Sequence, residues 1–223
     1  MHPALLRVRN KATALALQLL LRPETTEQLV RLGSDYGGWW VPVSALTPGS
    51  VAYCAGAGED ITFDLALLDR GLRVTTFDPT PRAIAHVAAV APDDARFRFE
   101  PVGWWDTKTQ LKFYAPSNPA HVSHSAVNLQ GTTEFFTADV EPVHEIATRL
   151  GDTDIAVLKM DIEGAEYRVL DSLVRHGPRA RCLCVEFDQP APLRRTLHAV
   201  RELRLAGYRL ARLEGFNATF VRA

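Results

Sequence analysis

The segment Ser50-Val-Ala-Tyr-Cys-Ala-Gly-Ala-Gly-Glu-Asp60 decides the fold, because an apolar run of strand length ends there in two closely spaced glycines. Residues 50–54 are expected to form a buried strand, and the apolar residues after Asp60 recur with helical spacing until Gly71. A strand, a glycine-containing turn and a helix in this order begin a nucleotide-binding βαβ unit. In such folds the ligand lies beyond the carboxyl ends of the strands, where glycines let the backbone approach it.

Outward from this segment, apolar runs of strand length alternate with periodic segments of helix length. The alternation predicts an α/β fold, Rossmann-like and doubly wound, with a mostly parallel sheet and right-handed crossovers. Strands are expected at residues 73–77, 97–102, 155–160 and 182–187. Helices are expected at 83–90, 143–150, 167–174 and 193–205. The remaining runs predict a strand pair around a long loop (111–114 and 135–140) and an antiparallel C-terminal edge hairpin (208–213 and 218–221).

The composition is that of an ordinary globular protein. Of the 223 residues, 47% are apolar and 23% are charged, which argues against disorder. A formal net charge of -1 gives no electrostatic reason to expect a nucleic-acid partner. Cys54, Cys182 and Cys184 cannot form a disulfide framework and are expected to be small buried apolar residues. This cysteine usage favours the reducing cytoplasm.

The N-terminal region is expected to be helical. Arg7, Arg9 and Lys11 precede an apolar stretch at residues 12–21, which is too short to span a bilayer and precedes no convincing cleavage site. The sequence from Arg22 to Thr26 predicts a helix stop and the N-cap of a second helix. We favour an amphipathic helix that packs on the domain or on a second subunit, without firm membrane association. A signal peptide or a membrane-surface helix is the alternative.

Residues near the first turn distinguish between nucleoside cofactors. Asp78 lies 20 residues after Gly58 and can accept hydrogen bonds from both ribose hydroxyls of an adenosine. The third glycine of a dinucleotide fingerprint is replaced by Ile61. Glu59 and Asp60 are expected at the helix N-terminus, where they would repel a diphosphate but tolerate the sulfonium and ammonium of S-adenosylmethionine. The plainer alternative is that both carboxylates only cap the helix.

The sequence Val157-Leu-Lys-Met-Asp-Ile-Glu-Gly-Ala-Glu166 resembles the hallmark motif of the FkbM methyltransferases. Further similarities are Gly37-Gly38-Trp39, Gly56–Asp60, Phe77–Pro81 and Ser123-His124-Ser125, so that the resemblance covers residues 33–190. Cys54 and Gly58 depart from many members, which have an acidic residue and an Asn there. The resemblance implies a class I methyltransferase domain, S-adenosylmethionine as donor, and a hydroxyl of a sugar or secondary metabolite as acceptor.

The resemblance gives a domain division and a candidate cofactor site. We expect an N-terminal helical extension at residues 1–46, a methyltransferase domain at 47–223, and a substrate-loop insertion at 103–140. Trp104 could stack on the adenine, although most tryptophans belong to the core. The candidate cofactor-binding residues are Gly56, Ala57, Gly58, Glu59, Asp60, Asp78, Pro79, Thr80, Gly103, Trp104 and Asp161.

Methyl transfer to an alcohol needs the two reactants in line and a group that takes the hydroxyl proton. Asp161 and Glu163 end one predicted strand, and Glu186 and Asp188 end the next. Four close carboxylates repel one another unless a cation joins them, so Asp161, Glu186 and Asp188 could hold Mg²⁺. Alternatively, Asp161 is the base, and Glu163 and Glu166 cap the helix after Gly164. A third, purely structural alternative is capping together with ion pairs to Lys159 or Arg168.

His124 is the best candidate among the imidazoles, because it lies in the long loop where a substrate lid is expected. Its alternative is a surface loop histidine. The candidate catalytic residues are therefore Asp161, Glu163 and His124. The expected partner is a small-molecule hydroxyl acceptor, and a homodimer is a further expectation. Two other functions stay open: a nucleotide-dependent oxidoreductase or epimerase, disfavoured because a Tyr-x-x-x-Lys pair is lacking, and a non-catalytic cofactor-binding protein.

Overall fold

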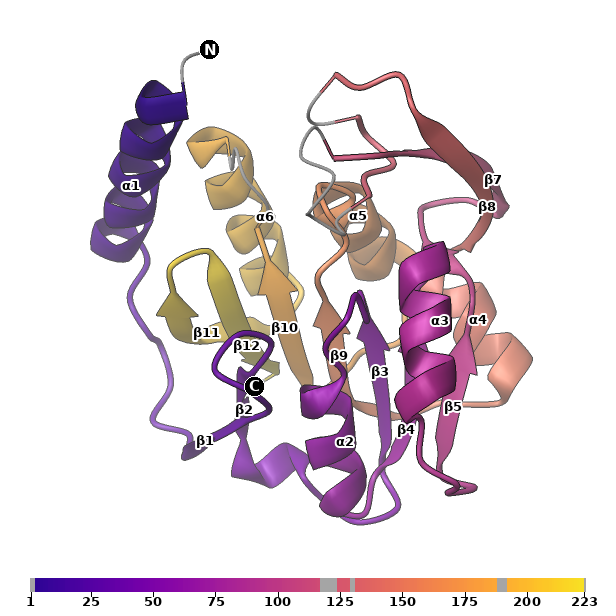
Figure 1. The fold of residues 1–223 in the computed structure, drawn as a ribbon. Coiled ribbons are helices and arrows are strands. Elements are labelled where there is room, and N and C mark those ends of the chain that lie inside the picture. Colours follow the sequence, from indigo (N-terminus) through magenta and orange to yellow (C-terminus); the bar gives the residue numbers. More distant parts are fainter. Residues whose placement is uncertain (1–2, 117–123, 129–130, 188–191, 223) are drawn as a thin grey trace.

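Seven strands form the central sheet, in the order β11-β12-β10-β9-β3-β4-β5 (Figure 1). The computed structural model describes residues 3–116, 124–128, 131–187 and 192–222. The strands from β10 to β5 are parallel, whereas β12 runs antiparallel to β10 and to β11. The predicted mostly parallel sheet with an antiparallel edge hairpin is thereby confirmed. The strand bounds are β3 (Val51–Ala55), β4 (Arg73–Phe77), β5 (Phe97–Glu100), β9 (Ile155–Met160), β10 (Cys182–Glu186), β11 (Tyr208–Glu214) and β12 (Asn217–Arg222).

The strand order reverses between β3 and β9. From β3 the chain moves outward through β4 to β5, and it then returns to β9 on the other side of β3. Such a reversal leaves a crevice at the carboxyl ends of the two central strands, where ligands bind in open α/β sheets. Both strands are fully buried, which explains why their residues are apolar except for Lys159 in β9.

Helices cover both faces of the sheet (Figure 1). Helices α4 (Val143–Leu150), α5 (Glu166–His176) and α6 (Leu193–Leu205) share one hydrophobic core with Tyr53, Leu158 and Leu183. On the other face, α2 (Thr62–Asp69) packs Phe63 and Leu67 against the side chains that alternate with these. Helix α3 (Pro81–Val90) packs beside α2. The three cysteines are free and buried within the second core, as predicted.

A three-stranded sheet stands beside the end of β5, in the order β6-β8-β7. Its strands are β6 (Gly103–Trp104), β7 (Thr109–Tyr114) and β8 (Phe135–Glu141). Strands β7 and β8 pair antiparallel from Thr109↔Val140 to Tyr114↔Phe135, which confirms the predicted strand pair. The sheet spans residues 103–141, one residue beyond the predicted insertion at 103–140, and a substrate-loop role for this segment stays a prediction.

The N-terminal region contains one helix, and the predicted second helix is wrong. Helix α1 (Pro3–Leu20) packs beside α6 and buries Leu17 and Leu21. The Thr25 hydroxyl accepts the N–H of Glu27 in a local turn, where a helix N-cap was predicted. The chain then forms a separate antiparallel sheet of β1 (Leu29–Leu32) and β2 (Trp39–Pro42), followed by the 3-10 turn η1 (Val43–Ala45). Trp39 and Val41 are buried in the core beneath α2. The burial of these β-prone residues in the tertiary structure therefore favours strands in this segment over the predicted helix.

Candidate functional site

A cavity of about 270 Å³ opens at the carboxyl ends of β3, β4, β9 and β10, over the point where the strand order reverses. Every predicted cofactor residue lines it, from Gly56 in the first turn to Asp161 after β9. The predicted catalytic residues Glu163 and His124 line it as well, as does Glu186. Asp188, the third predicted metal ligand, lies outside the described residues. The structure therefore brings the predicted site residues that it describes together at one cavity. The roles of the individual residues stay predictions.

The turn between β3 and α2 must approach the end of β9 very closely. Gly56 has a φ of +88°, and a Cβ built there would lie 1.8 Å from the carbonyl oxygen of Asp161. No other residue fits this position without moving one of the two strands. The carbonyl of Gly56 accepts a hydrogen bond of 2.6 Å from Lys159 Nζ, which fixes the turn from below.

The carboxylate of Asp78 is held by backbone amides on both sides. Its Oδ2 accepts the N–H of Gly58 at 3.0 Å, and its Oδ1 accepts the N–H of Thr80 at 2.8 Å. The Thr80 hydroxyl in turn accepts the N–H of Ala83 and caps α3. Each carboxylate oxygen keeps a lone pair, so Asp78 can still accept hydrogen bonds from two ligand hydroxyls.

The expectation that Glu59 and Asp60 both sit at a helix N-terminus is half wrong. Helix α2 begins at Thr62 with Ile61 as its N-cap, and Asp60, one residue earlier, accepts the N–H of Thr62 at 2.9 Å through Oδ1. Glu59 lies outside the helix and pairs with Arg82 of α3 at 2.8 Å instead. The prediction assumed a helix directly after Gly58, but the chain makes a turn there first.

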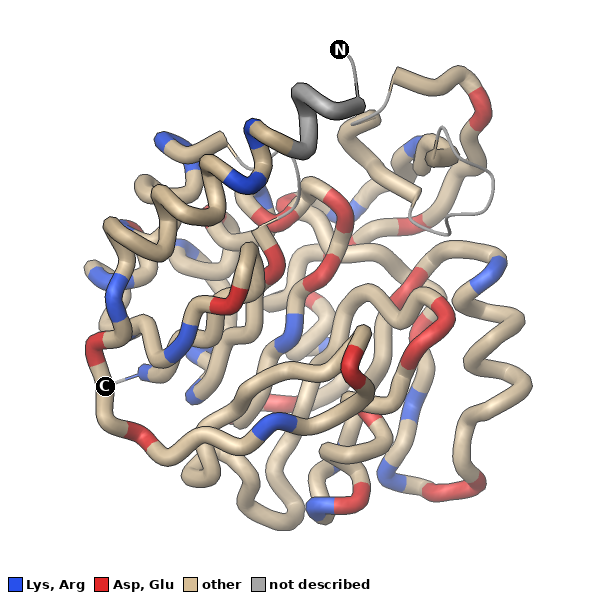
Figure 2. The backbone as a smooth tube through the Cα atoms, turned by 60° about the vertical axis from the view of Figure 1, so that its left-hand side comes forward, with Lys and Arg blue, Asp and Glu red and all other residues tan. Residues whose placement is uncertain are grey.

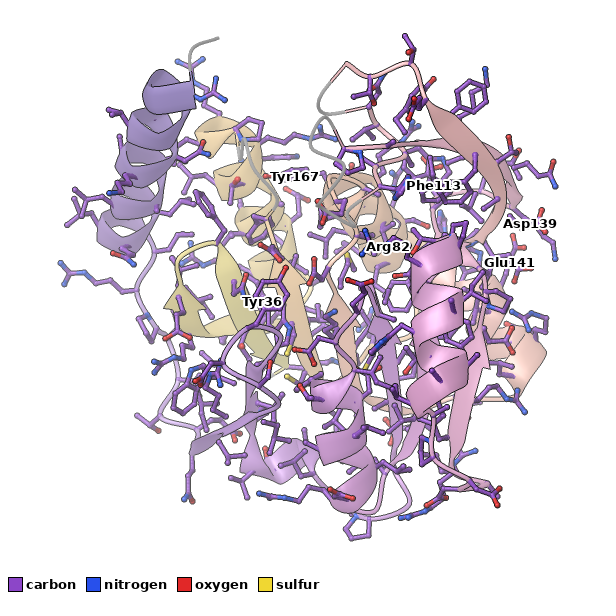
Figure 3. The ribbon with its side chains drawn as sticks, viewed as in Figure 1. Tyr36, Arg82, Phe113, Asp139, Glu141 and Tyr167 are labelled. Carbon is purple, nitrogen blue, oxygen red and sulfur yellow. The ribbon has the colours of Figure 1, made fainter. Side chains whose placement is uncertain are left out.

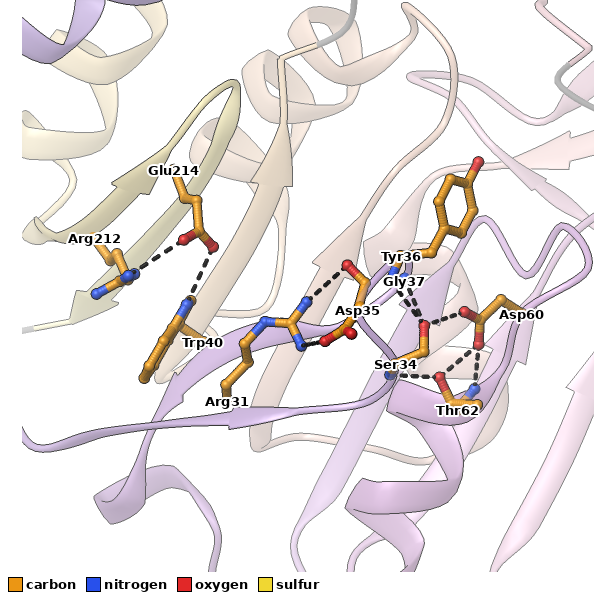
Figure 4. A network of polar contacts seen from close by, with 10 residues as sticks. All are labelled: Arg31, Ser34, Asp35, Tyr36, Gly37, Trp40, Asp60, Thr62, Arg212 and Glu214. Carbon is orange, nitrogen blue, oxygen red and sulfur yellow. Dashed lines mark hydrogen bonds and ion pairs between the residues drawn. The ribbon is translucent and has the colours of Figure 1, made fainter.

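The segment between β1 and β2 is anchored to Asp60 (Figure 4). Asp60 Oδ2 accepts the Ser34 hydroxyl at 2.5 Å, and Ser34 Oγ accepts the N–H of Gly37 at 2.9 Å. Burial raises the pKa of Asp60, but hydrogen bonds from Ser34 and Thr62 outweigh it and hold this pKa below its ordinary value. Asp60 therefore stays ionised and connects the N-terminal segment to the edge of the cavity.

Lys159 is a buried cation beneath the cavity. Its side chain is 7% exposed, and Nζ lies 3.5 Å from Asp161 Oδ2. Burial lowers the pKa of Lys159, but the charges of Asp161 and Asp64 outweigh it and raise this pKa. Asp64 is buried and accepts a hydrogen bond from Thr76; burial raises its pKa to about 6, against the opposing charge of Lys159. Lysine thus supplies the positive charge that the close carboxylates require.

A metal ion has no comparable support. Among the described residues, no group of three or more His, Cys, Asp or Glu side chains is arranged to hold one. Asp161 is instead paired with Lys159, one of the alternatives that the sequence left open.

The turn after β9 is strained. Glu163 has a φ of 55°, in the left-handed region that non-glycine residues seldom adopt, and the Ser125 hydroxyl donates to its carbonyl oxygen at 2.6 Å. Glu166 Oε1 accepts the N–H groups of Ile162 and Gly164 at 3.2 and 3.0 Å. Both amides precede Ala165, the N-cap of α5, so Glu166 closes the turn before the helix and the predicted helix cap is wrong for it. Glu163 lines the cavity instead. Strain of this kind concentrates at functional sites.

Aromatic side chains close the cavity on its β6 and β7 side. Trp104 is 3% exposed and packs against Phe77 with ring centroids 5.3 Å apart, so it is a core residue that also lines the cavity. Its Nε1 is buried and has no hydrogen-bond partner among the described residues. His124 lines the cavity too, and its ring lies edge-on to Phe136 at 5.1 Å.

Several lining residues were missed by the sequence reasoning, and Tyr36 and Phe113 are two of them. Tyr36 comes from the N-terminal segment and Phe113 from β7, and they reach the cavity from opposite sides (Figure 3). The side chain of Tyr36 is exposed as a whole, but desolvation of its hydroxyl and the charges of Asp161, Glu163 and Glu186 raise its pKa. Its neighbour Gly37 belongs to the Gly-Gly-Trp similarity, which was the available signal.

A family profile described as the methyltransferase FkbM domain matches residues 51–210, most of the chain and all of the predicted cofactor residues. The chain belongs to the FkbM methyltransferase family. No curated protein matches it. Two solved structures with similar folds are a fibrillarin pre-rRNA processing protein of Methanococcus jannaschii and a TehB-like methyltransferase of Corynebacterium glutamicum.

The fibrillarin protein is 7% identical with a TM-score of 0.47, and the match covers 88% of this chain and 81% of the other. The TehB-like protein, whose description calls it S-adenosylmethionine-dependent, is 13% identical with a TM-score of 0.41, over 81% and 85% of the two chains. At these values the likeness carries no argument about function. Membership of the family makes the chain an S-adenosylmethionine-dependent methyltransferase.

The described residues fit this cofactor. Asp78 presents two fixed carboxylate oxygens, as a ribose requires, and Trp104 Nε1 is a buried donor without a partner among the described groups. Gly58 has space on the side where a Cβ would stand, so a ligand can approach the backbone there. The acidic lining suits a ligand that carries a sulfonium and an ammonium.

Proposed function

We propose that the protein transfers a methyl group from S-adenosylmethionine to a hydroxyl oxygen of a small molecule, with Asp161 as the proton acceptor. The observation that carries this proposal is the placement of Asp161. Its carboxylate lies in the cavity directly beside the β3–α2 turn, and a buried lysine pairs with it. A carboxylate so placed stands between the donor-binding turn and the open part of the cavity.

The donor side would be formed by Asp78 and the turn around Gly58. The bound cofactor supplies an electrophilic methyl group on a sulfonium, so the protein has to bind, orient and exclude water. Asp78 would accept the ribose hydroxyls, and Trp104 would donate from its indole N–H. Holding donor and acceptor in line can supply much of the rate of such a displacement.

The acceptor side would be formed by the ends of β9 and β10. As the new C–O bond forms, the hydroxyl proton would pass to Asp161, which Lys159 keeps in position. Glu163, His124 and Tyr36 surround the same space and would orient the acceptor. A sugar or a hydroxylated secondary metabolite is the acceptor class that we propose. The buried, unpaired cysteines support a cytoplasmic location.

Calorimetry with S-adenosylmethionine, S-adenosylhomocysteine and NAD tests the donor. We expect the first two to bind and NAD not to bind. Asp78→Ala should weaken binding at least about tenfold, or roughly 1.4 kcal/mol, whereas the exposed Asp171→Ala should leave it unchanged. Binding of NAD alone would contradict the proposal.

Mass spectrometry with a panel of hydroxylated acceptors tests the base. Asp161→Asn should keep the affinity for S-adenosylhomocysteine within about threefold but lower methyl transfer by about 10²-fold or more. Equal turnover by Asp161→Asn and the wild type would show that another group takes the proton, and His124→Gln would then be assayed.

A further inference from the structure

Helix α1 has apolar side chains on two opposite faces. Leu17 and Leu21 face the domain core and are 0% and 4% exposed. Val8, Leu15 and Leu19 are 66%, 58% and 65% exposed and, with Ala12, follow the spacing i, i+4, i+7, i+11. This spacing aligns them in one stripe, and the helical period places the stripe opposite Leu17. The exposure of the outer stripe shows that it is not packed against the part of the chain that the structure describes.

Basic side chains lie on both sides of this outer stripe. At about 100° per residue, exposed Arg9 and Lys11 fall to either side of Val8. Residues 1–22 contain no Asp or Glu, and Figure 2 shows only Lys and Arg coloured along α1. The nearest acidic residue after the helix is Glu24, which pairs with Arg204 at 2.9 Å. The neighbouring helix α6 adds Arg194 and Arg201, both exposed.

These charges distinguish between the occupants that an apolar stripe can have. In a symmetric dimer the same patch meets itself, so the basic flanks of one α1 would meet the basic flanks of the other without a carboxylate from α1 between them. An anionic bilayer surface complements both features, because its phosphates pair with the basic flanks and its acyl region accepts the stripe. In the part of the chain that the structure describes, no helix is long and apolar enough to cross a membrane.

We propose that α1 docks the protein on an anionic lipid surface, lying in the plane of the bilayer with Val8, Leu15 and Leu19 toward the acyl chains. This inference is independent of the proposed methyl acceptor. It takes up the membrane-surface alternative that the sequence left open, in place of the sequence-based preference for packing without firm membrane association.

Vesicle flotation of the full chain tests the proposal. We expect binding to vesicles of phosphatidylcholine mixed with phosphatidylglycerol, and little binding to phosphatidylcholine alone. The double variants Leu15→Gln/Leu19→Gln and Arg9→Gln/Lys11→Gln should each weaken the partition by about tenfold, and so should raising the salt toward about 1 M. Val90→Gln changes an exposed apolar residue on α3 and should bind like the wild type.

Unchanged affinity for S-adenosylhomocysteine in both double variants would show that they are folded. Equal binding to both vesicle types, or equal binding by the wild type and Leu15→Gln/Leu19→Gln, would overturn the proposal. Light scattering decides the competing occupant: a dimeric mass that becomes monomeric in Leu15→Gln/Leu19→Gln would make the stripe a self-association surface, and the lipid proposal would be wrong.

Discussion

The buried charge of Lys159 connects two parts of the site. It donates to the carbonyl of Gly56 and pairs with Asp161, so it joins the donor turn to the proposed base. Lys159→Met should destabilise the fold by roughly 3–5 kcal/mol, because it leaves buried carboxylates without their counter-charge. The exposed Lys112→Met is the control, expected to change stability by less than about 1 kcal/mol. Urea unfolding measures the stability of both variants. Equal losses of stability would show that Lys159 does not stabilise the fold more than an exposed lysine does.

Asp64 should give stability an unusual pH dependence. Its pKa is raised to about 6 by burial, so between about pH 4 and pH 6 the folded chain binds a proton that the unfolded chain has lost. This contribution is fully present at low pH and disappears as the pH rises through about 6, amounting to roughly 3 kcal/mol. Asp64→Asn should remove it. Urea midpoints of the wild type and of Asp64→Asn, measured across this pH range, isolate the contribution of Asp64. If the two midpoints change with pH in the same way, the pH dependence does not come from Asp64.

Gly56 tests the close approach of two strands. Gly56→Ala places a methyl group on the carbonyl oxygen of Asp161 and should cost roughly 3 kcal/mol or more, with loss of S-adenosylhomocysteine binding. Gly151 has a φ of +75° but no atom within 4 Å of a built Cβ, so Gly151→Ala should cost only about 1 kcal/mol. Thermal unfolding of the two variants separates the effect of the steric clash from that of backbone strain. Similar losses of stability in both would show that β3 and β9 can move apart to accommodate the methyl group.

At the scale of the elements, sequence patterns succeeded where burial is uniform. Strand β9 and helix α4 match their predicted ranges, because a run that is apolar except for Lys159 and a strong 3.6-residue period each indicate a single structure. Strands β1 and β2 were missed because their burial depends on α2 and β10, far away in the sequence. The contact between Ser34 and Asp60 is likewise set by tertiary folding, and no local pattern records it.

The β1–β2 connection should therefore depend on Ser34. Its hydroxyl donates to Asp60 and accepts the N–H groups of Tyr36 and Gly37. Ser34→Ala should cost roughly 1–3 kcal/mol and weaken S-adenosylhomocysteine binding several-fold, because the segment beside the cavity loosens. The Ser44 hydroxyl donates only to the exposed side chain of Glu27, so Ser44→Ala should stay within about 0.5 kcal/mol. Calorimetry and urea unfolding check both, and an unaltered Ser34→Ala would refute the anchor.

At the scale of the whole molecule, charges of opposite sign are separated despite a net charge of only -1. Arg9 and Lys11 of α1 and Arg194 and Arg201 of α6 are exposed, while carboxylates gather around the cavity. Among its described lining residues, Lys159 is the only Lys or Arg. The acidic lining residues are Glu59, Asp60, Asp64, Asp78, Asp161, Glu163 and Glu186. Such a cavity attracts cations and repels phosphorylated acceptors, because low-dielectric walls focus its field.

This field predicts the ranking of donor analogues. Sinefungin carries an amine where the donor carries its methylsulfonium, whereas S-adenosylhomocysteine is neutral at that atom. Sinefungin should bind at least about tenfold more tightly than S-adenosylhomocysteine, a difference of roughly 1.4 kcal/mol. This affinity ratio should fall when salt is added and in the variant Glu163→Gln. The exposed Glu134→Gln is the control and should leave the ratio unchanged. Calorimetry of both ligands on the three proteins gives these ratios. If the wild type binds both ligands equally tightly, the lining carboxylates are neutralised by their own neighbours. The cavity would then not repel anionic acceptors.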